Sequence, residues 1–122
     1  MTNHDLVRAA IVLQIPYFRG VFLRNKMPGE PLPRECGVMN LDNKNGTHWT
    51  LFLCNKAHDI AVYIDPYGNL PPPPEILKYF KQYSLVYYNF DKFQFNFGEH
   101  PSFVCGQWVL LLLVKLSKLV SK

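Results

Sequence analysis

The feature that most constrains the fold of this chain is a pair of apolar runs separated by a short polar connection. The runs cover residues 48–54 and 60–65, and residues 55–59 join them. This pattern is typical of two neighbouring antiparallel strands. In such a pair the start of one strand and the end of the other lie at the same edge of the sheet. We therefore expect His48 and Asp65 to lie close together.

Helical and strand patterns alternate along the rest of the chain. Apolar residues at helical spacing predict a helix over 5–14, and the prolines at 71–74 precede a second helix over 75–82. A largely apolar helix, buried on most sides, is expected from about Phe103. The other expected segments are strands over 36–41 and 84–90, a proline-punctuated loop over 28–33, a turn over 42–46 and an irregular stretch over 91–102.

These elements predict one α+β domain over residues 1–122. Its sheet is antiparallel or mixed, has about four to five strands, and packs against the C-terminal helix. The length of 122 residues leaves little room for a second core, and contents of 48% apolar and 15% aromatic residues argue against a disordered chain. The formal net charge of +4 is compatible with an anionic partner such as DNA, although no arginine-rich run or zinc-finger spacing makes that partner specific.

The cysteines indicate a reducing, intracellular setting. Cys36, Cys54 and Cys105 are odd in number and widely spaced, so neither a disulfide framework nor a thiolate zinc site is expected. The polar residues near the N-terminus are unlike a signal peptide. The apolar run 109–114 is followed by lysines and is much shorter than the roughly 20 residues that cross a bilayer. We expect no metal and no membrane partner.

A thiol, a base and an acid for acyl transfer can be assigned from local context. Cys105 is expected in the first turn of the last helix, where unpaired N–H groups and the helix dipole lower a thiol pKa. Gly106 beside it allows close approach of a substrate backbone. A thiol attacks a carbonyl only as the thiolate, so it needs an imidazole and a carboxylate that orients the ring. His48 and Asp65 fit these roles, and His100 is the rival base.

Acyl transfer also needs donors for the oxyanion that develops on the carbonyl. The backbone N–H of Cys105 and the side chain of Gln94 are the candidates. Gln107 is expected to point away from the same pocket, because it lies only two residues past the thiol on the helix. Trp49 is expected to shield the imidazole from water and to offer its backbone to a substrate.

The order His, Asp, Cys, with His-Trp after a glycine-containing turn and Cys-Gly at a helix start, resembles a known superfamily. This is the adenovirus-protease and ubiquitin-like-protein-protease superfamily of cysteine peptidases; in papain-like enzymes the cysteine comes first. The chain is similar above all to the protease-like proteins of small DNA viruses and viral-type transposons. The likeness spans about residues 15–113 and rests on Phe18–Phe22, Glu35–Leu41, Gly46–Trp49, Ile64–Gly68 and Val104–Gly106.

The resemblance implies a papain-like core in permuted order, with His48 as base, Asp65 as its orienting acid and Cys105 as nucleophile. It implies a polypeptide substrate: a viral or transposon precursor protein, or a conjugate of a ubiquitin-like modifier, in the host nucleus or the virion. No cofactor is implied, other than an activating peptide or DNA. The window in which the family has its oxyanion glutamine holds Gly98 and Glu99 in this chain.

Because this window holds no glutamine, a second interpretation stays open. It is a peptidase fold without catalysis that serves as a capsid-associated or protein-binding module. A third, a metal site formed by Cys105, His48 and another ligand, lacks suitable ligand spacing. The distance between the Cys105 and His48 side chains separates the first two interpretations, because a peptidase needs these groups within hydrogen-bond reach.

Overall fold

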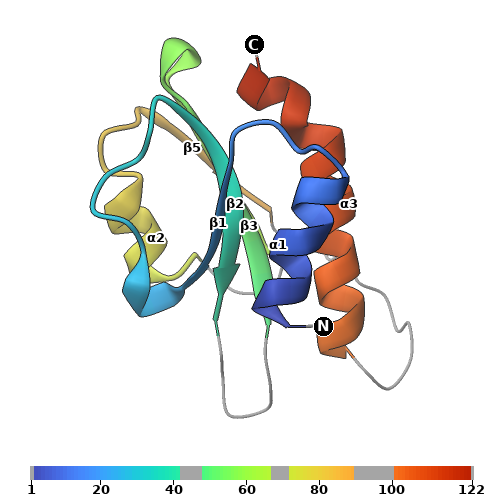
Figure 1. The fold of residues 1–122 in the computed structure, drawn as a ribbon. Coiled ribbons are helices and arrows are strands. Elements are labelled where there is room, and N and C mark those ends of the chain that lie inside the picture. Colours follow the sequence, from blue (N-terminus) through green and yellow to red (C-terminus); the bar gives the residue numbers. More distant parts are fainter. Residues whose placement is uncertain (1, 42–47, 67–71, 90–100, 122) are drawn as a thin grey trace.

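The computed structural model describes residues 2–41, 48–66, 72–89 and 101–121, without the side chains of 101–105 and 118–121. Figure 1 shows three layers: a central sheet has α2 on one face and α1 and α3 on the other. The helices are α1 (Asn3–Val12), α2 (Pro74–Tyr79) and α3 (Pro101–Ser121), and the strands are β1 (Phe18–Leu23), β2 (Arg34–Asn40), β3 (Trp49–Asn55), β4 (Ile60–Ile64) and β5 (Leu85–Tyr88). Short 3₁₀ turns, η1 (Arg24–Lys26) and η2 (Lys56–His58), follow β1 and β3.

The sheet is mixed and has five strands in the order β1-β2-β3-β4-β5. The inner strands β2, β3 and β4 are antiparallel neighbours, whereas β1 runs parallel to β2 and β5 runs parallel to β4. The β3–β4 pair is the hairpin expected from the two apolar runs, with η2 in the connection. The predicted α+β class, with a mixed sheet and a C-terminal helix, is therefore confirmed.

Side-chain alternation along β3 builds a core on each face of the sheet. Every residue of this strand is buried. Leu51 belongs to the core that includes Val109 of α3, whereas its neighbour Phe52 belongs to the core that includes Ile76 of α2. A strand covered on both faces is apolar at consecutive positions, which explains the continuous apolar run in the sequence.

Over residues 106–117, where its side chains are described, helix α3 is buried along one side. Val109 and Leu113 are buried, whereas Leu111 and Val114 are 46% and 42% exposed. For this described part the expectation of burial on most sides is wrong, because α3 forms an outer layer whose inner side meets β2, β3 and α1. Within the described parts of the chain, no helix combines the length and the apolar character of a membrane span.

A capping box marks the start of α1, and a proline marks the start of α3. Helix α1 begins at Asn3, before its expected start, because Thr2 and Asp5 form a reciprocal capping box. Helix α3 begins at Pro101, slightly earlier than expected, and proline suits a first helical position because it has no N–H to leave unpaired. The turn expected over 42–46 and most of the irregular stretch expected over 91–102 lie outside the described residues.

Candidate active site

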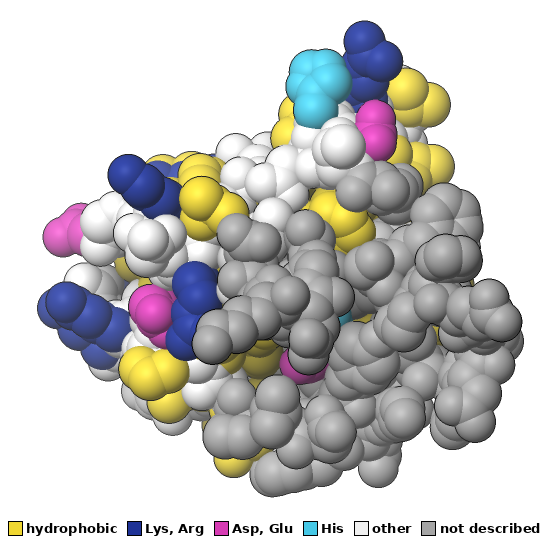
Figure 2. Space-filling view, turned by 90° about the horizontal axis from the view of Figure 1, so that it is seen from below, with side chains coloured by type: hydrophobic (Ala, Val, Ile, Leu, Met, Phe, Trp, Pro, Cys, Tyr) yellow, Lys and Arg dark blue, Asp and Glu magenta, His cyan; other side chains and the backbone are white. Residues whose placement is uncertain are grey.

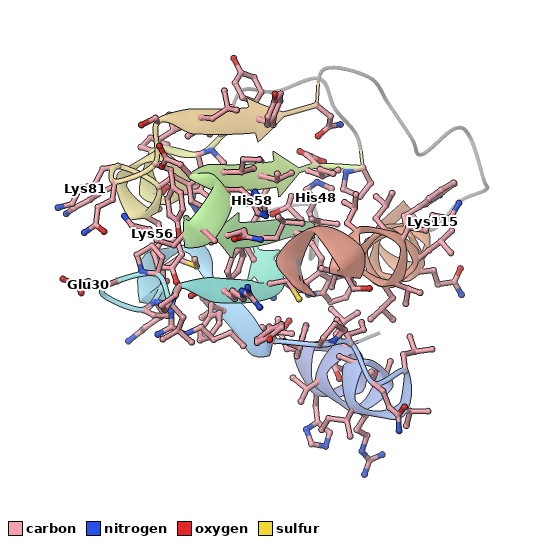
Figure 3. The ribbon with its side chains drawn as sticks, turned by 90° about the horizontal axis from the view of Figure 1, so that it is seen from above. Glu30, His48, Lys56, His58, Lys81 and Lys115 are labelled. Atoms are coloured by element: carbon pink, nitrogen blue, oxygen red, sulfur yellow. The ribbon has the colours of Figure 1, made fainter. Side chains whose placement is uncertain are left out.

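His48 and Asp65 form a buried pair at the end of the sheet where β3 begins and β4 ends. His48 Nε2 lies 2.7 Å from Asp65 Oδ1, and the two residues are only 8% and 4% exposed. The strand register explains this contact. Leu51 pairs with Ile64, so Asp65 lies opposite position 50, and His48 is its diagonal neighbour on the same face. The structure thus brings together the base and the acid expected from the hairpin, and Figure 3 shows His48 at this end of the sheet.

The backbone of the β2–β3 hairpin holds His48 from the other side. The N–H of Leu41 donates to the carbonyl oxygen of His48 at 2.8 Å, one step beyond the last strand pair, Asn40 with Trp49. Trp49 is 1% exposed, and its indole N–H donates to Oδ1 of Asn3 at 2.8 Å. This bond ties the first turn of α1 to the hairpin. The contact of Trp49 with a substrate stays a prediction.

Sequence reasoning missed one residue of this site, Asn89. The N–H of Asp65 donates to Oδ1 of Asn89 at 2.8 Å, and Nδ2 of Asn89 donates to the carbonyl oxygen of Asp65 at 2.7 Å. The only signal in the sequence is an asparagine near the end of the apolar run 84–90. The β4–β5 register is needed to place it beside Asp65.

Cys105 lies in α3, but further along the helix than expected. The expectation that it lies in the first turn is wrong, because Pro101 begins the helix and residues 101–104 precede the cysteine. The unpaired N–H groups of a helix belong to its first four residues, so the helix terminus acts on position 105 less strongly than it would on a residue of the first turn. Beside it, Gly106 is buried and Gln107 is exposed.

Three other parts of the predicted site lie outside the described structure. They are the side chain of Cys105 and the whole of Gln94 and His100. The distance from sulfur to imidazole therefore stays a prediction, as do the oxyanion roles of Gln94 and of the Cys105 backbone N–H.

The other two cysteines are buried thiols of low reactivity. Burial, followed by the negative charge of Glu35, raises the pKa of Cys36 to about 12. Burial likewise raises the pKa of Cys54 to about 12. Cys36 also donates its S–H to the carbonyl oxygen of Pro16, with a distance of 3.4 Å from Sγ to oxygen. Neither thiol has the thiolate character of a nucleophile at neutral pH.

Alkylation is therefore expected to discriminate among the three cysteines. At neutral pH, iodoacetamide should modify Cys105 at least roughly 100-fold faster than Cys36 or Cys54, because the reagent attacks thiolates. Raising the pH should speed up labelling of the two buried thiols about tenfold per unit, since their pKa of about 12 lies above the working range. Peptide mapping by mass spectrometry measures the rates. Protein unfolded in guanidinium, in which all three thiols should react alike, is the control, and equal rates in the native protein would contradict the prediction.

A second buried polar cluster lies on the α2 side of the sheet, around Glu35, which is 0% exposed. Nη1 of Arg19 donates to Oε2 of Glu35 at 2.8 Å, and the hydroxyl of Tyr79 donates to Oε1 at 2.5 Å. The N–H of Leu32 also donates to this carboxylate, and Arg19 reaches the carbonyl oxygen of Glu30 at 2.8 Å. Burial and the bond to Glu35 raise the pKa of Tyr79 above its ordinary value. The cluster joins β1, β2, α2 and the proline-rich loop.

The described surface also has a hollow of about 290 Å³ between η1 and α2. Figure 2 shows Lys and Arg side chains at the left of the molecule, the side on which Figure 1 places these two elements. Arg24 at the rim is paired with Glu75 through contacts of 3.1 and 2.8 Å. The hollow is lined by Arg24, Asn25, Met27, Pro28, Gly29, Glu75, Lys78, Tyr79 and Lys81. Of these residues Arg24, Lys78 and Lys81 are cationic and only Glu75 is acidic.

Neither a protein-family model nor a curated protein matches this chain.

What the candidate site can do chemically follows from the His48–Asp65 pair. A carboxylate only accepts hydrogen bonds, so Nε2 is the donor in the 2.7 Å contact. With Nε2 held in this way, Nδ1 is the nitrogen at which a neutral His48 would take up a proton and later return it.

Proposed function

We propose that this protein is a cysteine peptidase in which Cys105 is the nucleophile, His48 the base and Asp65 the acid that orients it. The observation that carries the proposal is the buried 2.7 Å contact between His48 Nε2 and Asp65 Oδ1. Burying two ionisable side chains costs free energy unless they are paired, as these two are. The core would be papain-like in permuted order, with α3 as the helix that carries the thiol.

The reaction would proceed by acyl transfer through Cys105. His48 takes the thiol proton at Nδ1, and the thiolate attacks the carbonyl carbon of the scissile peptide bond. The imidazolium then returns that proton to the leaving amine as the C–N bond breaks, which leaves a thioester on the enzyme. In the second half, His48 takes a proton from water, the hydroxide attacks the thioester carbonyl, and the C–S bond breaks to release the acid. The imidazolium returns its proton to the sulfur of Cys105. Asp65 stabilises the imidazolium in both halves of the cycle.

The proposed substrate is a polypeptide, cleaved as part of the maturation of viral or transposon precursor proteins. This assignment rests on the resemblance of the His-Trp, Ile-Asp-Pro-Tyr-Gly and Cys-Gly segments to such peptidases. Removal of a ubiquitin-like modifier is the alternative within the same chemistry. DNA, bound through the basic surface at η1 and α2, would be a partner rather than a substrate.

One observation favours a different class of function, a binding module without catalysis. The window that holds the family's oxyanion glutamine is occupied here by Gly98 and Glu99. A missing oxyanion donor slows acyl transfer by roughly 100- to 1000-fold. A chain that has lost that donor could keep the fold as a protein-binding domain of a capsid.

The deciding experiment combines two reagents with one variant. The protein is incubated with candidate precursor proteins and with a ubiquitin-like protein whose C-terminus carries an electrophile. A peptidase cleaves a precursor or forms a covalent adduct mapped to Cys105, and Cys105→Ala does neither. Binding of either reagent without cleavage and without an adduct would favour the binding module instead.

Variants of Asp65 should separate orientation of the imidazole from stabilisation of its charge. Asp65→Asn keeps an oxygen that can accept from His48 Nε2, so we expect a loss of only about tenfold in kcat, whereas Asp65→Ala removes the acceptor and should cost about 100-fold or more. Steady-state cleavage assays measure both values, with circular dichroism to verify folding. Equal losses for the two variants, or none, would contradict the assigned role.

A further inference from the structure

The backbone of Asp65 is held by a side chain at the point where the sheet ends. The β4–β5 pairing stops at Tyr63 and Tyr88. Beyond it, the amide of Asn89 accepts from the N–H of Asp65 at 2.8 Å and donates to its carbonyl oxygen at 2.7 Å. An asparagine amide has one acceptor and two donor hydrogens, so it can bind both backbone groups of one residue as a paired strand does.

This clamp sets the direction in which Asp65 projects its carboxylate. With its N–H and carbonyl both bound, the backbone of Asp65 has little freedom to rotate, and the Cα–Cβ bond keeps one direction. That direction matters, because the carboxylate is buried and meets His48 Nε2 at 2.7 Å. Functional groups must be held within about 0.5 Å of the productive geometry to work efficiently.

We propose that Asn89 is a positioning residue of the active site, which acts on His48 through Asp65. The inference rests on the proposed peptidase function for its kinetic consequence, but not for its structural one. Loss of the clamp lets the carboxylate swing away from Nε2, and the imidazole then loses the partner that selects its tautomer and orientation.

The test compares two variants at opposite ends of the same strand pair. Asn89→Ala removes both bonds to Asp65. Asp59→Ala is the matched control, because Oδ1 of Asp59 accepts from the N–H of Ser84 at 3.1 Å where β4 and β5 begin, far from His48 along the strands. Asp59 also has a φ of +52°, which alanine adopts at some cost, so the control is destabilised as well.

We expect Asn89→Ala to lower kcat about tenfold with KM within about twofold, and Asp59→Ala to change either by no more than about twofold. Asn89→Asp keeps the acceptor for the N–H of Asp65, but it lacks the donor to the Asp65 carbonyl and adds a negative charge. We therefore expect its kcat to be lowered as well. Equal kinetic losses in Asn89→Ala and Asp59→Ala would overturn the proposal, because general destabilisation of the fold would then explain both losses.

A readout independent of turnover is the ¹⁵N NMR spectrum of the His48 imidazole. In the wild type and in Asp59→Ala, the neutral ring should be protonated at Nε2, and in Asn89→Ala it should become a mixture of tautomers. An unchanged Nε2-protonated ring in Asn89→Ala would overturn the proposal. If the wild type cleaves no substrate, the proposed function fails, and the tautomer measurement still decides whether Asn89 positions the pair.

Discussion

Cys105→Ala is expected to abolish peptide-bond cleavage and adduct formation, with a loss of at least about 10⁴-fold in kcat, while the fold persists. The reason is chemical, because alanine has no group that can attack a carbonyl and the buried His48–Asp65 pair then has no thiol to deprotonate. Cleavage assays and probe labelling measure the loss, and circular dichroism with a urea titration verifies the fold.

Cys36→Ala is the matched control for loss of a thiol. Cys36 is a buried residue of the core, with a pKa raised to about 12 by burial. Its replacement should lower the free energy of unfolding by removing packed atoms but leave kcat within about twofold of the wild type. Full activity in Cys105→Ala would remove this cysteine from the mechanism. Loss of activity in both variants would point to unfolding rather than to chemistry.

Arg19→Ala is expected to destabilise the protein by about 3–5 kcal/mol, because it leaves the carboxylate of Glu35 buried without its cation. Glu35 is fully buried, and the side chain of Arg19 is only 22% exposed. The same change at Arg24 should cost no more than about 1 kcal/mol, since its pair with Glu75 is exposed to solvent and screened. Urea unfolding of the two variants gives the comparison.

The contrast between the two arginines makes this prediction specific. Both form a salt bridge with a closest contact of 2.8 Å, so distance alone predicts equal effects. Burial of the partner carboxylate is what separates them, 0% exposed for Glu35 against 36% for Glu75. Equal unfolding free energies for Arg19→Ala and Arg24→Ala would show that the Glu35 cluster tolerates an unpaired charge, contrary to its burial.

Local patterns were enough to predict the hairpin that carries the candidate site. The apolar runs around β3 and β4 are continuous in the sequence, and an antiparallel pair places the start of one beside the end of the next. The sequence alone therefore predicts that His48 and Asp65 lie close together. The extent of burial of α3 could not be predicted in the same way. The apolar run 109–114 does not show how many sides of the helix are covered by other elements.

The sequence by itself determined the α+β class, four of the five strands and the candidates His48, Asp65 and Cys105, since each depends on local patterns; it did not predict β1. Only the tertiary structure decided which imidazole nitrogen meets Asp65, that Asn89 holds the backbone of that residue, and that Glu35 is buried with Arg19. These contacts depend on strand register and on packing between distant segments. A shift of one residue in the strand register would turn the side chains to the other face of the sheet.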